Sequence, residues 1–131
     1  MSYLNDHQVE IVKTIEGIDG KAIAQLTGFL VPAGRKFITV GFVVRPTAVS
    51  GFAVTGSCSL ITGSATPIMA GVTLTGLDAV GKCYFGVTAG AIAGGSIPVV
   101  DAGDTVDFAI GTPYTASGAV TLSVDIIGYL I

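Results

Sequence analysis

The sequence predicts an all-β protein: a single domain of about eight short strands that pair antiparallel in a sandwich or barrel. Two observations indicate this fold. Short apolar or alternating segments follow one another along the 131 residues, and Gly, Pro, Ser or Asp separates most of them. Residues that favour strands are abundant, and no linker, charge run or solenoid repeat divides the chain. A chain of this length builds one sizeable hydrophobic core.

The N-terminal segment fits two structures. The apolar residues between positions 5 and 19 suit either an alternating strand or a short helix that begins at Asn5. We therefore expect residues 1–20 to form an N-terminal segment or arm, and residues 21–131 to form the β-sandwich domain.

Most of the remaining chain divides into short strands. The clearest alternation lies at residues 120–126, where the even positions are apolar and the odd ones polar. This pattern is typical of a half-buried strand. The predicted strands are residues 22–30, 37–44, 51–54, 58–62, 72–77, 82–88, 97–100, 106–110 and 120–126.

Two stretches are apolar on both sides of the predicted strand. They are residues 37–44 and, apart from Gly128, residues 127–131. A strand of this kind is covered on both faces, so we expect a second layer over each side of these two. Pro46 predicts that the first of the two strands ends there or lies at the edge of a sheet.

One local pattern occurs twice. Residues 31–37 and 100–106 both read V-x-A-G-x-x followed by an apolar residue. In each, a glycine (Gly34 or Gly103) stands in a turn that tolerates a positive φ angle, and a strand follows. We interpret the two as the same supersecondary step, not as duplicated domains.

Charge is scarce in this chain. Only 11% of the residues are charged, against roughly 25% in an ordinary soluble domain. Between Arg45 and Asp78 there are 32 consecutive residues, 46–77, without a charged side chain. A small monomer exposes much of its surface, and charge normally keeps that surface from associating. We therefore expect neighbouring subunits or a partner to cover part of it.

The charge pattern also excludes several partners. Residues 1–50 carry five basic and four acidic side chains, and residues 51–131 carry one and five, so there is no basic stripe to bind nucleic acid. The charge-free windows at 46–77 and 83–100 are broken by Pro and Gly, which predicts no membrane-spanning helix. The N-terminus lacks the pattern of a secretory signal.

Asp101, Asp104 and Asp107 lie close together in the sequence and are the best candidates for a metal site. A calcium-binding loop needs alternating Asp or Asn ligands and a distal bidentate Glu, which this stretch lacks. We expect Asp101 and Asp104 to cap backbone N–H groups of a turn and Asp107 to point outward on the next strand. A structural ion site is the alternative, and we predict no metal and no cofactor.

The sequence offers little for catalysis. His7 is the only histidine and stands near the terminus beside Asp6, where we expect a solvated side chain. There is no nucleophile-elbow motif and no phosphate-binding loop. Paired carboxylates for glycoside hydrolysis stay open by spacing, but there is no Trp and the tyrosines are scattered. We predict a non-enzymatic protein.

Cys58 and Cys83 lack CxxC spacing. We predict that both are small buried hydrophobic residues. A single disulfide between them is the alternative if the protein matures outside a reducing compartment.

The C-terminal third resembles a known family. The stretch VDAGDTVDFAI at 100–110, a Ser/Gly turn, and AVTLSVDIIGYLI at 119–131 are similar to capsid decoration (cement) proteins of tailed bacteriophages and related small virion proteins. The VPAG turn at 31–34 fits the same picture. The resemblance implies a jelly-roll β-sandwich that forms trimers at three-fold positions of the capsid and stabilises the shell.

On this basis we expect a homotrimer that binds the major capsid protein, is made in the host cytoplasm and resides on the virion surface. We predict that Lys13 and Lys21 contact the capsid. The residues predicted at the contact between subunits are Phe37, Phe42, Ile127, Tyr129 and Ile131. For Phe37, Phe42 and Ile127 the alternative is a position in the core of the single chain.

Two other functions remain open. A fibre or spike tip that binds a surface glycan is the first, and it requires an exposed groove with aromatic residues and polar loops. A secreted adhesin or matrix subunit is the second, and it requires a signal sequence.

Overall fold

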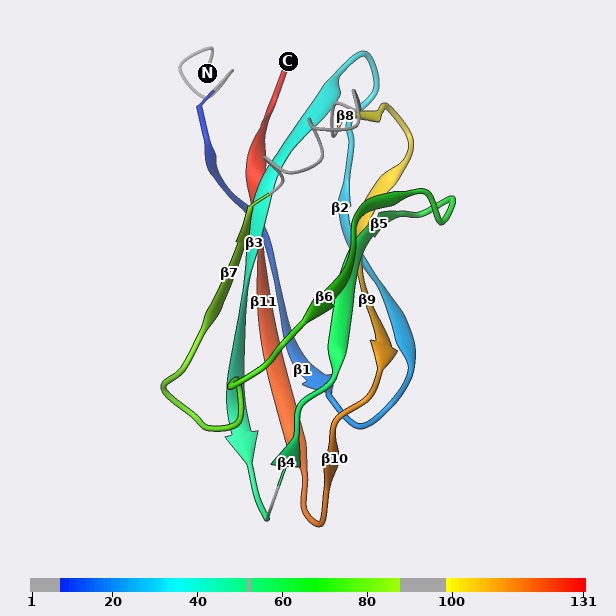
Figure 1. Cartoon of the computed structure of the whole chain (residues 1–131). Helices are drawn as coiled ribbons and strands as arrows, with labels where there is room; N and C mark the ends of the chain where they lie inside the picture. Colours follow the sequence, from blue (N-terminus) through cyan, green and yellow to red (C-terminus); the bar gives the residue numbers. More distant parts are fainter. Residues whose placement is uncertain (1–7, 52, 88–98) are drawn as a thin grey trace.

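The structure is a computed structural model that describes residues 8–51, 53–87 and 99–131. The described residues form strands and turns and contain no helix, which confirms the predicted all-β class (Figure 1). The strands are β1 (Glu10–Asp19), β2 (Ala24–Leu30), β3 (Lys36–Val49), β4 (Ala53–Val54), β5 (Ser57–Thr62), β6 (Pro67–Thr73), β7 (Tyr84–Val87), β8 (Val99–Asp101), β9 (Thr105–Thr112), β10 (Thr115–Ala116) and β11 (Val120–Leu130).

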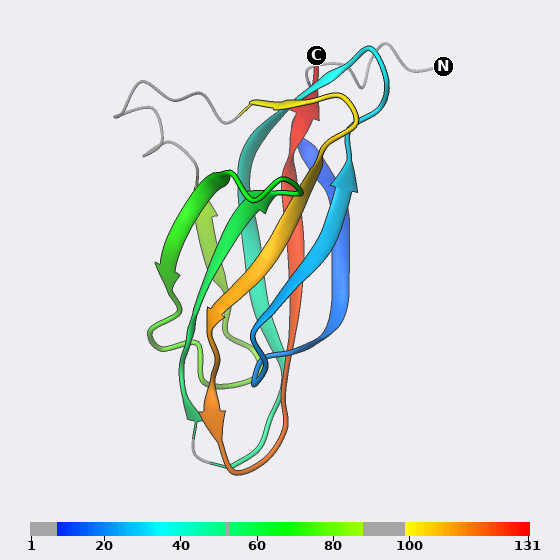
Figure 2. The same ribbon diagram turned by 90° about the vertical axis from the view of Figure 1, so that its right-hand side faces the viewer.

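Two antiparallel sheets pack face to face as a sandwich. Sheet A has the order β1-β11-β3-β7, with β8 also paired to β3, and sheet B has the order β2-β9-β5-β6. Strands β4 and β10 form a small separate ribbon. Figure 2 shows sheet B in front of sheet A. The sequence analysis predicted about eight strands, and eight of the eleven described strands have four residues or more.

The strand order is that of a jelly roll. If the eight longer strands are numbered along the chain, sheet A joins the first, eighth, third and sixth, and sheet B joins the second, seventh, fourth and fifth. Consecutive strands therefore cross between the sheets repeatedly, as two interleaved Greek keys do. Because every described pairing is antiparallel, the predicted fold class is confirmed.

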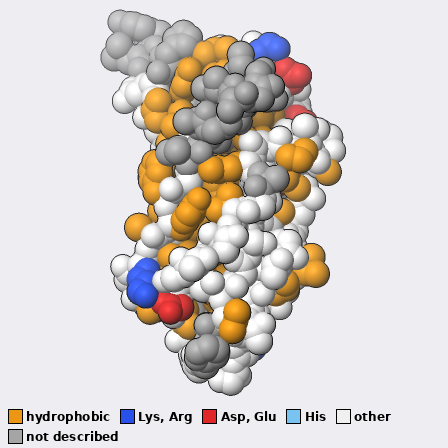
Figure 3. Space-filling model, viewed as in Figure 1, with side chains coloured by type: hydrophobic (Ala, Val, Ile, Leu, Met, Phe, Trp, Pro, Cys, Tyr) orange, Lys and Arg blue, Asp and Glu red, His pale blue; other side chains and the backbone are white. Residues whose placement is uncertain are grey.

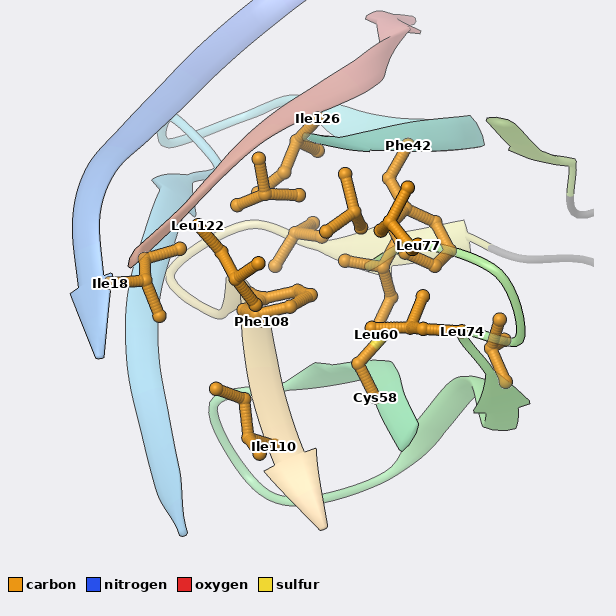
Figure 4. Close-up of a cluster of buried hydrophobic side chains, with 14 of the residues drawn as sticks. Ile18, Phe42, Cys58, Leu60, Leu74, Leu77, Phe108, Ile110, Leu122 and Ile126 are labelled. Atoms are coloured by element: carbon orange, nitrogen blue, oxygen red, sulfur yellow. The ribbon is translucent and has the colours of Figure 1, made fainter. Parts of the chain in front are cut away.

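The core lies between the two sheets (Figure 4). Phe42 from sheet A and Phe108 from sheet B are fully buried and their ring centroids lie 6.4 Å apart. Leu122 and Ile126 from β11 and Leu60 from β5 are also completely buried around them. Burying each of these side chains stabilises the fold by about 1.5–3 kcal/mol.

The segment predicted as an arm contains a strand of the sandwich. β1 pairs along its length with β11, and Ile18 is buried in the core. Residues 10–19 therefore belong to the sandwich, which corrects the boundary expected at residue 20; residues 1–7 lie outside the described part. β1 is the outer strand of sheet A, and two register irregularities and a positive φ of 67° at Gly17 distort it.

Of the two expectations for Pro46, the end of the strand is wrong, because β3 continues to Val49, whereas the sheet-edge alternative holds locally. Pro46 lies opposite Leu122, at a register irregularity between β3 and β11. The pairing of β3 with β7 ends at Val44, so at Pro46 the described pairings give β3 a single neighbour. A bulge and an unpaired strand edge are the two settings that tolerate proline in a sheet.

The predicted strand at 72–77 is placed wrongly. The strand is β6, and the apolar residues after it belong to a turn in which Leu77 N donates to Leu74 O at 3.0 Å. Leu74 and Leu77 are nevertheless buried, 1% and 3% exposed, and enter the core between the sheets. Their apolar pattern reflects burial in the core and not a strand.

The two V-x-A-G turns are built as predicted and lie side by side. Gly34 and Gly103 have φ angles of 75° and 85°. Val31 N donates to Asp104 O at 3.0 Å, and Gly103 N donates to Val31 O at 3.0 Å. These bonds join the end of β2 to the turn before β9 and close one end of the sandwich.

Candidate interaction surface

The outward side of sheet A is largely apolar. Inward residues of β11, such as Val124 and Ile126, are completely buried in the core, so the residues between them point outward. We define the sheet A face as the set of outward side chains between the charged positions at the two ends of this sheet, which are the Lys36–Asp101 pair at one end and Asp19 at the other. The set consists of Ile11, Thr14, Ile38, Val43, Arg45, Phe85, Val99, Ser123, Asp125, Ile127 and Tyr129.

Cross-strand pairing arranges this face in rows. Phe85 lies opposite Val43, and Val43 lies opposite Asp125. The next row joins Ile127 of β11 to Ile11 of β1. Phe85 and Ile11 are 55% and 56% exposed, which is high for large apolar side chains in strands. Exposed apolar residues that adjoin one another typically mark an interaction site.

A polar network lies in the middle of the face. Asp125 forms an ion pair with Arg45 Nη1, and Thr14 Oγ1 donates to Asp125 Oδ1 at 2.7 Å. Arg45 Nη2 also donates to Ser123 Oγ at 3.0 Å. Asp125 and Ser123 are only 7% and 1% exposed, although they point outward. The charges of Arg45 and Asp125 therefore neutralise each other within the face. The hydrogen-bonding groups of Thr14 and Ser123 are satisfied by the same two side chains.

The pKa of Asp125 reflects this network. Burial acts to raise the pKa of its carboxyl, but the hydrogen bonds from Arg45 and Thr14 and the charge of Arg45 outweigh burial and lower it below its usual value. Asp125 is therefore ionised at neutral pH, and the ion pair with Arg45 is intact there.

The outward side of sheet B has a different character. It contains the nearly buried Asp107 on β9, which is only 3% exposed. The carboxylate of Asp107 accepts hydrogen bonds from Gln25 Nε2 at 2.9 Å and from Gly28 N at 3.2 Å. Ile61 lies directly opposite Asp107 on β5, and the polar residues Ser59 and Ser57 follow further along that strand. The most exposed apolar side chain of this sheet is Leu30 at the end of its outer strand β2, which is 60% exposed.

An open groove of about 430 Å³ borders the sheet A face. Its lining includes Arg45, Pro46, Val80, Lys82 and Cys83. Both of its cations already have acidic partners, because Arg45 pairs with Asp125 and Lys82 Nζ lies 2.6 Å from Asp78 Oδ1. The groove therefore presents no uncompensated charge to an anion.

The side of the molecule on which β6 and β7 form the sheet edges is also poor in charge. Hydrophobic side chains run down most of its length, and charged ones gather in two small places (Figure 3). β6, which lies within the charge-free run, provides one of these two edges. The long uncharged segment of the sequence is therefore partly a surface feature.

The structure divides the residues predicted at the contact between subunits. Phe37 and Phe42 are 0% exposed inside a single chain, so they belong to the core and have no surface for a partner; their assignment to the contact is corrected. Ile127 and Tyr129 are half-buried on the sheet A face. Ile131 is 42% exposed and exchanges two backbone hydrogen bonds with Lys36.

The two lysines predicted to contact the capsid are exposed at one edge of the sandwich. Lys13 lies on β1, and Lys21 lies in the turn from β1 to β2. Lys21 Nζ donates to Gly118 O at 3.0 Å, which fixes its position relative to the turn before β11. Both are available to a partner, and their role stays a prediction.

The cysteines are free thiols in different settings, and the alternative of a disulfide is not realised. Cys58 is 1% exposed in the core, and burial raises the pKa of its thiol to about 12. Cys83 is exposed, which contradicts the prediction of a buried hydrophobic residue. It immediately precedes the short edge strand β7, where no layer covers it.

The three aspartates considered for calcium do not converge. Asp104 accepts Thr105 N at 2.8 Å and Ser64 Oγ at 3.0 Å, as expected of turn chemistry. Asp101 pairs with Lys36, and Asp107 points outward on sheet B. Within the described ranges no group of three or more His, Cys, Asp or Glu side chains is placed to hold a metal ion. His7 lies outside those ranges.

In the described residues, no helix is long and apolar enough to cross a membrane.

Sequence reasoning did not find the polar network or the exposed Phe85. A signal for the network was present, because Arg45 is the only charged residue between Lys36 and Asp78, and Asp125 is the only one after Asp107. Two isolated charges of opposite sign within apolar strands are best satisfied by each other. The exposure of Phe85 follows from its register with Val43, which the sequence pattern does not determine.

No protein-family model, curated protein or solved structure matched this chain. The strand pairings themselves define the class of this protein, a single-domain jelly-roll sandwich.

Proposed function

We propose that this chain is a non-enzymatic structural protein of a virus particle. It is a decoration or cement protein that binds the capsid surface as an oligomer, most simply a trimer, and stabilises the shell. Jelly rolls recur in viral capsid domains, which supports this class, although lectins and cupins use them too. The observation that carries the proposal is the apolar, internally neutral sheet A face on a chain with few charges.

The mechanism is binding. An oligomer that contacts two neighbouring capsomers links them, and shell expansion or rupture must then break these contacts as well. A sandwich of antiparallel strands suits this task because its rigid sheets transmit strain, and because small side chains lose little conformational entropy when surfaces dock.

The charged edge of the sandwich is the proposed capsid contact. β1 and the turn after it carry Glu10, Lys13, Glu16, Asp19 and Lys21, which makes this edge richer in charge than the sheet A face. Charged groups at the rim of an interface set the rate and the specificity of association more than its affinity. Lys13 and Lys21 thus orient the oligomer on the shell.

Capsids that lack the protein provide the test. Purified protein is added to them, and co-sedimentation and resistance of the capsids to heat or chelator are measured. The proposal expects saturable binding and more stable capsids. Binding to host cells in the absence of binding to any capsid contradicts it.

Charge variants make this test specific. Lys13→Ala combined with Lys21→Ala is expected to weaken co-sedimentation by about tenfold or more. The matched control is Lys36→Ala combined with Lys82→Ala, because these two exposed lysines lie on other elements and are each paired with an aspartate. Equal loss in both double variants would assign the effect to net charge.

A glycan-binding fibre or spike tip has less support. It needs aromatic side chains in an exposed groove, whereas Tyr114 is buried with its hydroxyl donating to Leu77 O at 2.7 Å. Tyr84 packs against Phe42, with ring centroids 6.1 Å apart. The described groove beside Arg45 is lined without an aromatic residue.

A further inference from the structure

We infer that the sheet A face is the surface through which copies of this chain pack against one another. The inference rests on the oligomer of the proposed function and names the surface and the partner, a second copy of the chain. Three properties of the face support it: its uncovered apolar rows, its internal neutrality and its size.

The first property is a mismatch between the sequence and a single chain. The apolar stretches at 37–44 and 127–131 have the composition of strands covered on both sides. In one chain the inward side of each is covered by sheet B, whereas Val43 and Ile127 on the outward side remain only half-buried. The composition therefore calls for a second layer that the described residues do not provide.

The second property identifies a copy of the chain as that layer. Each chain carries a net charge of −3, so two copies repel one another through most surfaces. On β3, β7 and β11, however, the described charged residues are Lys36, Arg45 and Asp125, and each is paired: Arg45 with Asp125, and Lys36 with Asp101 of β8. A second copy therefore meets no unpaired charge on these strands, and the other charges of sheet A lie on the outer strand β1, where Glu16 acts on Arg45. A charged partner, in contrast, finds nothing on this face to recognise.

The third property is area. β11 has 11 residues, which at about 3.4 Å each span about 37 Å, and four strands about 4.8 Å apart are roughly 19 Å wide. Because β7 has only four residues, the face measures at most roughly 700 Å² in projection, which approaches the roughly 800 Å² per partner of a standard protein interface. Contact between two such faces is therefore of the size that a specific oligomer needs.

The polar network fits the centre of this interface. Buried charges weaken association when they lose water without a partner. Asp125 and Ser123 have already lost most of their water in the single chain, and Arg45 and Thr14 satisfy them. Docking therefore adds little desolvation cost at Asp125 and Ser123, and Arg45, which is 38% exposed, loses its remaining water while it is paired with Asp125. Phe85 and Ile11 on either side provide the apolar contact.

Sedimentation velocity of the purified chain without capsids tests the inference. The wild-type protein is expected to be oligomeric at micromolar concentration. Phe85→Lys and Ile11→Lys alter exposed side chains on the two outer strands of the face, so both variants should fold, and circular dichroism verifies this. Each is expected to weaken self-association by about tenfold or more. Thr27→Lys is the control, because it adds the same charge to an exposed position of β2 in sheet B.

The outcomes separate this inference from the proposed function. A monomeric wild-type chain, or an oligomer that both face variants leave intact, overturns the inference. Dissociation by Thr27→Lys to the same degree overturns it as well. A monomer whose capsid binding is abolished by Phe85→Lys assigns the face to the capsid, which overturns the inference and supports the function. An oligomer that dissociates as expected but binds no capsid supports the inference and contradicts the function.

Discussion

The two sheets of the sandwich share a core but differ on their outward sides. Each outward side holds one nearly buried aspartate: Asp125 on sheet A and Asp107 on sheet B. Asp125 is held by a charged side chain and is surrounded by apolar residues. Asp107 is held by the amide of Gln25 and the backbone of Gly28, and Ile61 lies opposite it on β5.

Under the inference above, this difference separates an outward side that associates from one that does not. The outward side of sheet B holds its aspartate without a cation and combines polar residues such as Ser57 and Ser59 with the apolar Ile61. On sheet A the apolar rows favour cover, and the Arg45–Asp125 and Lys36–Asp101 pairs neutralise the charges of β3 and β11 that would oppose it. The contrast leads to four predictions, given from the largest expected effect to the smallest.

Gly28→Ala should destabilise the protein most. A Cβ atom at Gly28 would lie 2.1 Å from Val106 O and 2.6 Å from Ile126 Cδ1, so β2 must move away from β9 and from Asp107. We expect a loss of about 3 kcal/mol in the free energy of unfolding, measured by urea denaturation. Gly111→Ala on β9 is the control, because a Cβ there meets nothing within 4 Å. Equal stability of the two variants would show that Asp107 is not held by a fixed backbone.

Replacing the two aspartates should have unequal effects. Asp125→Asn leaves Arg45 without its counter-charge, and we expect a loss of about 2 kcal/mol, limited by the partial exposure of the guanidinium. Asp107→Asn keeps an acceptor for Gly28 N, and a reoriented Gln25 amide satisfies the rest, so the expected loss is about 0.5 kcal/mol. Urea denaturation at pH 7 measures both. If Asp107→Asn lost more stability than Asp125→Asn, the charge of Asp107 would matter more to the fold than the ion pair of Asp125.

The contribution of Asp125 should depend on pH. Because its pKa is lower in the folded chain than in the unfolded chain, the stabilisation is complete above the unfolded value of about 3.9 and is lost as pH falls through the folded value. The stability difference between wild type and Asp125→Asn should therefore narrow below about pH 4. Unfolding curves from pH 7 to acid measure it. When both proteins also carry Arg45→Met, the difference in unfolding free energy caused by Asp125→Asn should no longer narrow at low pH. If it still narrows, a group other than Arg45 lowers the pKa of Asp125.

The two thiols should differ in reactivity with almost no effect on stability. A thiol-specific reagent should modify Cys83 in the native chain, because it is exposed, and should spare Cys58, which is buried with a pKa of about 12. One thiol per chain is therefore expected in buffer and two in denaturant. Cys83→Ser should abolish the native reaction. A native reaction that persists in this variant would mean that the core opens around β5.

Sequence reasoning recovered the layers of this fold better than its outward surfaces. The alternation at 120–126 gives the inward and outward sides of β11, and the glycine turns before β3 and β9 occur as predicted. Pro46 and Leu74–Leu77 were misplaced because tertiary packing overrode a local rule: a bulge tolerates the proline, and the core receives the leucines. Phe37 and Phe42 were assigned to a contact because composition alone does not distinguish a core from an interface.

The candidate site depends on register, which lies beyond local pattern. Pairing of Phe85 with Val43 and of Asp125 with Thr14 joins residues far apart in sequence, and a shift by one residue would exchange the sides of a strand. The sequence did indicate that residues 127–131 needed cover. It did not indicate that Phe85 and Ile11 would frame the same face.

The irregular outer strand β1 is poorly suited to pair with a strand of another molecule. Straight, uncharged edge strands let sheets of different molecules join end to end into fibres, whereas charges and bulges prevent this. β1 has both, with Lys13 and Glu16 beside its two register irregularities. Copies that meet through the broad side of the sheet are then barred from growing by strand addition at β1. A high local concentration of the protein therefore does not lead to fibre growth by strand pairing at β1.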